Sequence, residues 1–204
     1  MRRAGRLAGA AALGYLAGTI PSADLAARAA TGGSVDLRAA GSGNPGGANA
    51  SKVLGARWGA GVMAADIVKA AVAARAGQRL AGGAGAHVAG TASVIGHCFP
   101  VWRRFRGGGK GVACSVGQCL ATFPAYLPID LGVAALTATG PWKQRARSAT
   151  VVSSFFWVIG AAVWWRRDLP NGWGPRPTPG LPIAAAASSA VILHRFFRPE
   201  RATS

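Results

Sequence analysis

Residues 80–102 read LAGGAGAHVAGTASVIGHCFPVW and contain no aspartate, glutamate, lysine or arginine. A helix of about 17–25 apolar residues is long enough to cross the hydrocarbon core of a bilayer. The same charges are missing from four more stretches, at residues 7–23, 112–129, 148–165 and 177–193. The chain is therefore expected to cross a membrane several times.

The composition of the 204-residue chain agrees with this expectation. Apolar residues make up 50% and charged residues 14%, against roughly a quarter charged in an average soluble domain. The net charge of +17 suits either a nucleic acid or an anionic membrane surface. Because the basic residues gather between the apolar stretches, we expect membrane lipid, and no nucleic acid, as the partner.

We predict an all-α integral membrane protein with about seven transmembrane helices (five to seven), formed by residues 1–204 as a single domain. Placing the N-terminus outside and the C-terminus in the cytoplasm gives the inner segments the larger share of the lysines and arginines, as the positive-inside rule favours. The expected spans are 7–27, 53–75, 80–101, 111–124, 127–140, 148–165 and 180–196.

Two features inside the expected spans concern packing and charge. Gly14 and Gly18 have the spacing that brings membrane helices into close contact, although an alanine- and glycine-rich sequence also produces such pairs by composition. Asp66 and Lys69 lie one helical turn apart, where ionisable groups either neutralise each other or face a polar cavity. The three cysteines lack metal-site or disulfide spacing, so we expect them to be small buried residues.

The first of two unusual inner loops reads DLRAAGSGNPGGANASK, residues 36–52. Its glycines let the backbone approach a ligand closely, while Ser42, Asn44 and Asn49 supply small hydrogen-bonding groups. Asn49 is placed to cap the following helix, whose N-terminus would favour an anion. Taken alone, a loop of this composition is more often a plain turn.

The second inner loop reads GHCFPVWRRFRGGGKGVA, residues 96–113. Consecutive glycines lie between Arg106 and Lys110 and precede a helix, so backbone N–H groups, the helix dipole and a lysine charge can act together on a phosphate. This is not a Walker A loop, because Gly111 follows the lysine where serine or threonine is required. A basic loop touching lipid headgroups is the other interpretation, and three adjacent glycines favour phosphate binding over it.

Several short motifs occur in one order along the chain and together resemble the bacterial integral-membrane acyl-phosphate:glycerol-3-phosphate acyltransferase family (PlsY), over about residues 15–155. The motifs are Ile20-Pro21-Ser22, Asp36-Leu37-Arg38, Gly41-Ser42-Gly43-Asn44-Pro45-Gly46, Asp66-Ile67-Val68-Lys69, Gly96-His97-Cys98-Phe99-Pro100-Val101 and Gly108-Gly109-Lys110-Gly111-Val112-Ala113.

This resemblance implies a compact bundle of seven helices and a reaction at the cytoplasmic face of the bacterial plasma membrane. A fatty acyl group would move from acyl phosphate to the sn-1 hydroxyl of glycerol 3-phosphate, giving lysophosphatidate and phosphate. Acyl phosphate is an activated mixed anhydride, so the protein has mainly to position two phosphates and stabilise developing charge. No metal and no organic cofactor is expected, and a monomer is favoured.

The resemblance also implies which residues form the site. Catalytic roles fall on Ser42, His97 and Lys110. The base for the attacking hydroxyl is either His97 or a phosphate of the substrate. His97 is equally compatible with a structural role, as a helix-end residue bonded to the backbone. Substrate phosphate binding falls on Lys52, Gly108, Gly109, Lys110, Arg147 and Ser153, and supporting roles fall on Asn44, Asn49, Ser154 and His194.

The chain departs from the family pattern in several places: Gly46-Gly47-Ala48-Asn49 lacks the threonine hydroxyl of the family, and the glycine run is one residue longer than usual. Lys52 replaces an arginine and so loses a bidentate fork, and of the third family motif only His194-Arg195 and Glu200 remain. These departures keep open a divergent paralogue with a different phosphorylated acceptor. A membrane transporter for a phosphorylated solute is the alternative from another class of protein.

Overall fold

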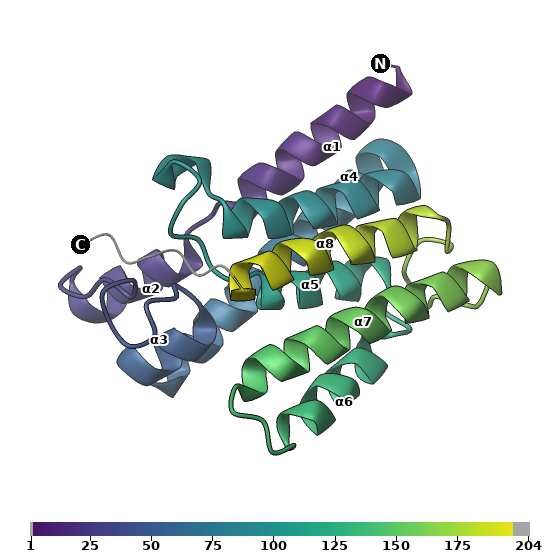
Figure 1. The fold of residues 1–204 in the computed structure, drawn as a ribbon. Helices are drawn as coiled ribbons and strands as arrows, with labels where there is room; N and C mark the ends of the chain where they lie inside the picture. The colour runs from purple at the N-terminus through teal and green to yellow at the C-terminus, as the bar shows by residue number, and fades with distance from the viewer. Residues whose placement is uncertain (1, 198–204) are drawn as a thin grey trace.

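The computed structural model describes residues 2–197, and every regular element within that range is a helix (Figure 1). The predicted all-α fold class is thus confirmed, while Glu200 lies outside the described residues. In chain order the elements are α1 (Arg3–Gly18), α2 (Ser22–Thr31), α3 (Gly47–Val53), α4 (Ala56–Cys98), the short 3-10 helix η1 (Val101–Arg103), α5 (Val112–Thr122), α6 (Leu127–Ala138), α7 (Arg145–Arg166) and α8 (Gly180–Phe197).

The first expected span, residues 7–27, is not one continuous helix, and that prediction is wrong. α1 ends at Gly18, and α2 begins at Ser22, directly after Pro21. Proline lacks a backbone N–H and disfavours helical geometry in the residue before it, so the helix cannot continue through Ile20. The carbonyl of Ile20 thereby becomes available to a side-chain donor.

α4 consists of two arms, residues 56–80 and 83–98, joined by a sharp turn at Ala81 and Gly82. The arms correspond to the expected spans 53–75 and 80–101, with the turn a few residues later than predicted. Gly82 has φ = 65°, in the left-handed region that favours glycine. The arms approach closely beside the turn, because a Cβ on Gly77 or Gly85 would collide with the carbonyl of the other.

α1 packs along the second arm of α4 with almost no space between the two backbones. A Cβ on Gly14 would collide with the Ala89 carbonyl, and a Cβ on Gly18 with the Ser93 carbonyl. The close-packing interpretation of these two glycines is therefore confirmed. Backbone contact at this distance maximises dispersion attraction, which is the main source of helix association where lipid removes the hydrophobic driving force.

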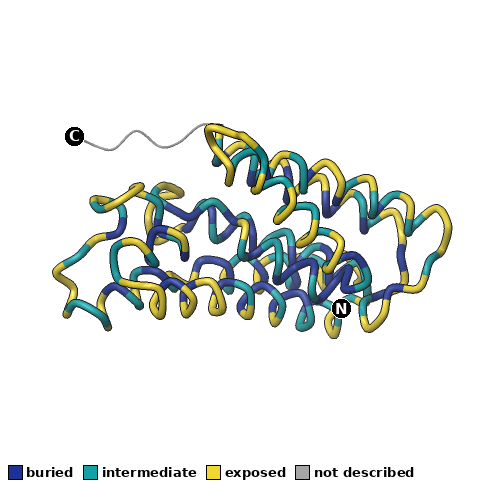
Figure 2. Tube along the Cα trace, turned by 90° about the horizontal axis from the view of Figure 1, so that it is seen from below, coloured by how far each residue is buried: buried dark blue, intermediate teal, exposed yellow. Residues whose placement is uncertain are grey.

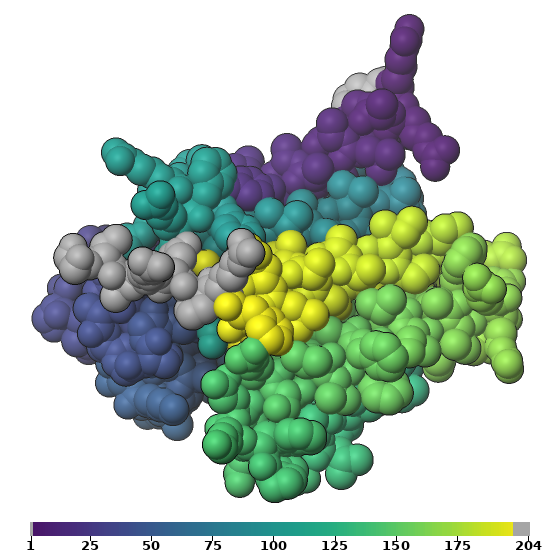
Figure 3. Space-filling view, viewed as in Figure 1, coloured from purple at the N-terminus to yellow at the C-terminus, as the bar shows by residue number. Residues whose placement is uncertain are grey.

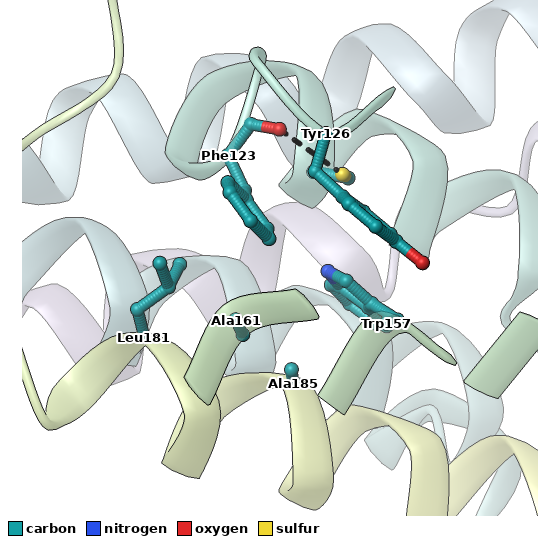
Figure 4. Close-up of a cluster of buried hydrophobic side chains, with 7 residues drawn as sticks. Phe123, Tyr126, Trp157, Ala161, Leu181 and Ala185 are labelled. Carbon is teal, nitrogen blue, oxygen red and sulfur yellow. Dashed lines mark hydrogen bonds between the residues drawn. The ribbon is translucent and has the colours of Figure 1, made fainter. Parts of the chain in front are cut away.

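The remaining helices cover the other side of α4. α5 packs on the first arm, where a Cβ on Gly117 would collide with the Ile67 carbonyl. A buried cluster rich in aromatic rings joins the end of α5 and the segment between α5 and α6 to α7 and α8 (Figure 4). Its rings of Phe123 and Tyr126 are stacked with centroids 5.0 Å apart, and Trp157 and Leu181 complete it. In the space-filling view α8 lies across the front of the molecule, beside α7 (Figure 3).

The outer faces of the helices are apolar as well as the inner ones. Among the described helices, α7 and α8 are long and apolar enough to cross a membrane, whereas α5 and α6 are apolar but shorter. Exposed residues follow the outer sides of the helices (Figure 2). Large apolar residues that are exposed include Val72 at 61%, Phe155 at 62% and Ile183 at 67%. Such a surface suits lipid better than water. The count of seven spans and their orientation stay predictions.

The segments richest in polar residues gather at one end of the bundle. α2, α3, the loop after α4 and the last turn of α8 lie there together, and the N-terminus of α1 lies at the other end (Figure 1). All three cysteines are free and buried inside the bundle, as expected. The two loops singled out in the sequence therefore share one face of the protein.

The contact between α1 and α4 predicts opposite outcomes for two glycines of the same helix. Gly14→Ala adds a methyl group against the Ala89 backbone and should destabilise the protein by about 1–3 kcal/mol, the usual cost of overpacking. Gly9→Ala is the matched control, because a Cβ there meets nothing within 4 Å, and it should be neutral or stabilising. Thermal unfolding in detergent measures both; equal melting temperatures would contradict the packing described.

Candidate active site

The glycine run after α4 is held in place by two arginines from distant parts of the chain. The Arg38 Nε donates to the Gly107 carbonyl at 2.7 Å. Arg195, which is buried on α8, donates from Nη2 to the Gly108 carbonyl at 2.7 Å and from Nε to the Gly109 carbonyl at 3.2 Å. Two guanidinium groups thus surround the loop and place fixed positive charge beside it.

Glycine is required in this run because its neighbours approach the backbone directly. A Cβ on Gly108 would collide with the Cys98 carbonyl, and a Cβ on Gly109 with His97 Nε2. The N–H of Gly109 donates to the His97 carbonyl at 3.1 Å. Within residues 2–197, the N–H of Gly108 makes no hydrogen bond. Of the N–H groups of Gly108 and Gly109, that of Gly108 is therefore the one available to an anion.

Arg38 is itself fixed by two carboxylates. Its Nη1 and Nη2 donate to the two carboxylate oxygens of Asp24, at 2.5 and 3.2 Å, and Nη1 lies 3.4 Å from Asp36 Oδ1. Burial by itself would lower the pKa of Arg38, but the hydrogen bond and charge of Asp24, followed by those of Asp36, outweigh it and raise that pKa. The guanidinium therefore stays charged while Nε serves the glycine run.

A buried polar group lies beneath the run, between the two arms of α4. Lys69 Nζ lies 2.7 Å from Asp66 Oδ1 in an ion pair, and it donates to the Ile20 carbonyl at 2.8 Å. The same ammonium lies 3.2 Å from His97 Nδ1 on the opposite arm. Asp66 and Lys69 thus neutralise each other, and Asp66 also lines a cavity together with His97.

That cavity is a cleft of about 540 Å³, including its open mouth, at the polar end of the bundle. It receives side chains from the α1–α2 turn, the first loop, both arms of α4 and the second loop. Trp102 closes part of its rim by donating from Nε1 to Thr19 Oγ1 at 2.9 Å. The polar and charged side chains that line it are those of Thr19, Ser22, Asp24, Arg38, Asp66, His97 and Arg103. Gly108 and Gly109 line it with their backbone.

Asn49 organises the first loop from inside the protein. Its Oδ1 accepts the Ser42 N–H at 2.7 Å, and its Nδ2 donates to the carbonyls of Leu37 and Ala40 at 2.9 and 3.0 Å. The prediction that Asn49 caps a helix is wrong, because Asn49 lies within α3 and Gly46 is the residue before the helix. The buried amide serves three backbone groups of the loop instead, which orders the segment that carries Ser42.

The other predicted residues of the first loop lie nearer its surface. Ser42 and Lys52 are exposed, and Asn44 is partly buried. None of the three lines the cleft. Their roles stay predictions, and a ligand that reaches them has to extend beyond the cleft over α3.

Lys110 and His194 lie where the glycine run meets the end of α8. Lys110 Nζ is 4.3 Å from the centroid of the Phe196 ring, and the His194 ring is 6.0 Å from that of Phe99. Burial, and secondly the charge of Arg195, lowers the pKa of Lys110. Lys110 is thus a partly buried cation directly after the run.

The residues predicted on α7 are not brought to the cleft. Arg147 lies over the Phe197 ring at 3.8 Å, and Ser153 Oγ donates to Asp130 Oδ1 on α6 at 2.6 Å. Ser154 is buried within the bundle. A single ligand touching both α7 and the cleft would therefore have to bridge across the end of α8.

The structure thus gathers three predicted residues, His97, Gly108 and Gly109, in one cleft, with Lys110 adjacent. No local pattern predicts that Arg38 and Arg195 hold the glycine run. Arg38 belongs to a short motif, but its partner Gly107 is distant in the chain. Arg195 follows His194 in the sequence, and only the folded structure shows that it is buried.

A helical bundle with apolar outer faces and, at one end, a glycine-lined cleft that contains arginine, aspartate and histidine side chains suits a membrane-embedded protein with a polar ligand. A family model described as glycerol-3-phosphate acyltransferase matches residues 8–198. The chain belongs to this family.

Curated relatives and solved structures agree with this assignment. A glycerol-3-phosphate acyltransferase of Thermoanaerobacter sp. (strain X514) is 34% identical over 157 residues, covering 76% of each chain. One of Gloeobacter violaceus is 38% identical over 170 residues, covering 78% of this chain and 77% of the relative. The glycerol 3-phosphate form of PlsY (YgiH), an integral membrane glycerol 3-phosphate acyltransferase, superimposes with a TM-score of 0.70 at 26% identity, over 93% of this chain and 90% of that one.

The clamp on the glycine run predicts a specific requirement for arginine at position 195. Arg195→Lys keeps the charge but loses the planar fork that reaches two carbonyls. The rate of acyl transfer to glycerol 3-phosphate should therefore fall at least about tenfold, which corresponds to an activation free energy higher by about 1.4 kcal/mol. Arg176→Lys, in the exposed ion pair with Asp168, is the control and should leave the rate unchanged. Full activity of a folded Arg195→Lys protein would contradict the clamp.

Proposed function

We propose that this chain is an integral-membrane enzyme that transfers a fatty acyl group from acyl phosphate to the sn-1 hydroxyl of glycerol 3-phosphate. The products are lysophosphatidate and inorganic phosphate, so the reaction supplies a precursor of membrane phospholipid. The observation that carries the proposal is the glycine run, fixed between Arg38 and Arg195 at the edge of a cleft that contains His97. Family membership supports the choice of acceptor.

The chemistry places modest demands on the protein. The sn-1 oxygen attacks the acyl carbonyl carbon, a new C–O bond forms, and the bond from that carbon to the phosphate oxygen breaks. Phosphate is a good leaving group, so the main requirement is to hold two anionic substrates together and to stabilise the charge on the tetrahedral intermediate. The hydroxyl proton passes to a base, for which His97 and the substrate phosphate are the two candidates.

Two arginines line the cleft together with two carboxylates, Asp24, which pairs with Arg38, and Asp66, which pairs with Lys69. Lys110, Arg38 and Arg103 lie at or beside the cleft, and the Gly108 N–H adds a neutral donor. We assign the phosphate of acyl phosphate to the glycine run and Lys110. We assign Ser42, Lys52, Asn44 and Asn49 to the wall formed by the first loop, and His194, Arg147, Ser153 and Ser154 to the side formed by α7 and α8.

We further propose that the polar end of the bundle faces the cytoplasm of a bacterial plasma membrane and that the chain acts as a monomer. The arginines and lysines of both loops support this orientation under the positive-inside rule. Glycerol 3-phosphate would then enter from the cytoplasm, while the acyl chain of the donor would remain beside the apolar helix faces.

Purified protein in detergent tests the activity directly. With acyl phosphate and labelled glycerol 3-phosphate, labelled lysophosphatidate should form, and acyl-CoA should not replace the donor. Lys110→Ala should reduce the rate by about 10²–10³-fold, the usual effect of removing one group that stabilises developing charge. Arg79→Ala, an exposed arginine at the other end of α4's first arm, should have no effect. Folded protein that turns over no acyl phosphate would contradict the proposal.

The environment of Lys110 also predicts a pH dependence. Its pKa is lowered by burial and by Arg195, so its ammonium loses its proton, and with it the attraction for phosphate, at a lower pH than an ordinary lysine. KM for the phosphorylated substrate bound there should therefore rise as the pH becomes alkaline. Lys110→Arg keeps the charge and should remove this rise, since arginine stays protonated. Identical pH profiles for the two proteins would show that Lys110 does not bind phosphate.

A further inference from the structure

The buried group formed by Asp66, Lys69 and His97 has a geometry that decides where the histidine carries its proton. Lys69 comes from the first arm of α4 and His97 from the second, and the two side chains meet beneath the glycine run. The exposed fractions of the Lys69 and Asp66 side chains are 6% and 3%. Groups so well shielded from water interact with each other far more strongly than with solvent.

The Lys69 ammonium has three N–H groups and three polar neighbours, of which Asp66 Oδ1 is an ion-pair partner that accepts no hydrogen bond within the described residues. The ammonium donates to the Ile20 carbonyl at 2.8 Å, pairs with Asp66 Oδ1 at 2.7 Å and lies 3.2 Å from His97 Nδ1. An ammonium can only donate, so the nitrogen facing it has to accept through a lone pair. A proton on His97 Nδ1 would point two donors at each other across 3.2 Å.

Asp66 is too distant to reverse this assignment. His97 Nδ1 lies 3.6 Å from Asp66 Oδ1, beyond the range of a hydrogen bond. The ammonium therefore lies closer than the carboxylate to Nδ1 and determines its protonation. In neutral imidazole one nitrogen donates and the other accepts, so an accepting Nδ1 leaves the proton on Nε2.

Nε2 is the nitrogen that faces the site. It lies so close to Gly109 that a Cβ there would collide with it, and both residues line the cleft. Among residues 2–197, no group accepts a hydrogen bond from His97 Nε2. The side chain thus directs a donor without a protein partner toward the region where the phosphates would bind.

We propose that Asp66 and Lys69 are positioning residues that hold His97 as its Nε2–H tautomer, so that His97 donates a hydrogen bond to an anionic phosphate oxygen in the cleft. The inference rests on the proposed function and makes His97 a hydrogen-bond donor and not the base for the attacking hydroxyl. Ile20 is part of the same arrangement, because the helix break at Pro21 leaves the Ile20 carbonyl available to accept the hydrogen bond that orients Lys69.

A metal ion is the other occupant that this group invites, and the geometry opposes it. Asp66, His97 and Cys114 offer ligand atoms that lie within 4.8 Å of one another. The Lys69 ammonium already lies within 3.2 Å of both the aspartate and the histidine atoms, so a cation brought to the same atoms would be repelled. The Lys69 ammonium takes the place that a metal cation would have beside these atoms.

Nitrogen-15 NMR of the resting protein tests the tautomer without any substrate. The chain contains three histidines, so labelling them and comparing the wild type with His97→Gln assigns the His97 signals. We expect a protonated Nε2 and an unprotonated Nδ1 in the wild type, and we expect addition of glycerol 3-phosphate or inorganic phosphate to shift the Nε2 signal. A protonated Nδ1 in the wild type would overturn the proposal even if the enzyme were fully active.

Kinetics of the histidine variants separate a donor from a base. Glutamine retains an N–H near the position of Nε2 but is no base, so His97→Gln should keep activity within about tenfold of the wild type. His97→Ala should lose about 10²–10³-fold, as expected for a missing donor to a developing oxyanion. Equal, large losses in two folded proteins would show that His97 acts as the base.

The role of Lys69 is isolated by a double-mutant cycle. Lys69→Met leaves the Asp66 charge unpaired and is prone to misfold, so the variant to use is Asp66→Asn combined with Lys69→Met, which keeps the buried site neutral. In the wild-type background the double substitution should lower kcat at least about tenfold and broaden or shift the His97 signals. In the His97→Gln background it should change kcat little, because the effects of coupled residues are not additive. Equal effects in both backgrounds would assign Asp66 and Lys69 a purely structural role.

Failure of this inference and failure of the proposed function give different results. If no acyl phosphate is consumed while the NMR signals show Nε2–H, the inferred tautomer of His97 is correct and the proposed reaction is wrong. If turnover is normal while Nδ1 carries the proton, the reaction is correct and the role of His97 given above is not.

Discussion

The buried ammonium of Lys69 connects the parts of the molecule on which the site depends. Its three partners come from the α1–α2 break, from its own helical arm and from the opposite arm of α4. Removing a charge of this kind from its partners inside an apolar bundle is costly. The arms of α4, the end of α1 and the imidazole of His97 are therefore fixed relative to one another by one side chain.

Close backbone packing makes that arrangement possible. Gly14, Gly18 and Gly96 let α1 lie directly against the second arm of α4, and Gly117 does the same for α5 on the first arm. Glycine has the same function at the polar end, where Gly108 approaches the Cys98 carbonyl and Gly109 approaches the His97 imidazole in the last turn of α4. Small residues thus serve both the packing of the bundle and the access of a ligand to backbone and histidine.

The sequence predicted the helical class and the two loops because both depend on local signals, namely long stretches without charge and unusual glycine clusters. It did not predict the break of the first span, since the effect of Pro21 competes there with a continuous apolar pattern. The helix cap assigned to Asn49 was wrong for a related reason: the amide is used by loop carbonyls that fold back on it. The clamps formed by Arg38 and Arg195 join residues far apart in the chain, and only a folded structure brings such partners together.

We assign phosphate binding to the cleft beside the glycine run. The most direct measurement is an experimental structure of the protein with glycerol 3-phosphate and a non-hydrolysable acyl phosphate analogue bound. We expect a phosphate in contact with the Gly108 N–H, Lys110 and His97 Nε2. Both phosphates bound over Lys52 and Arg147, with the cleft free of ligand, would contradict it.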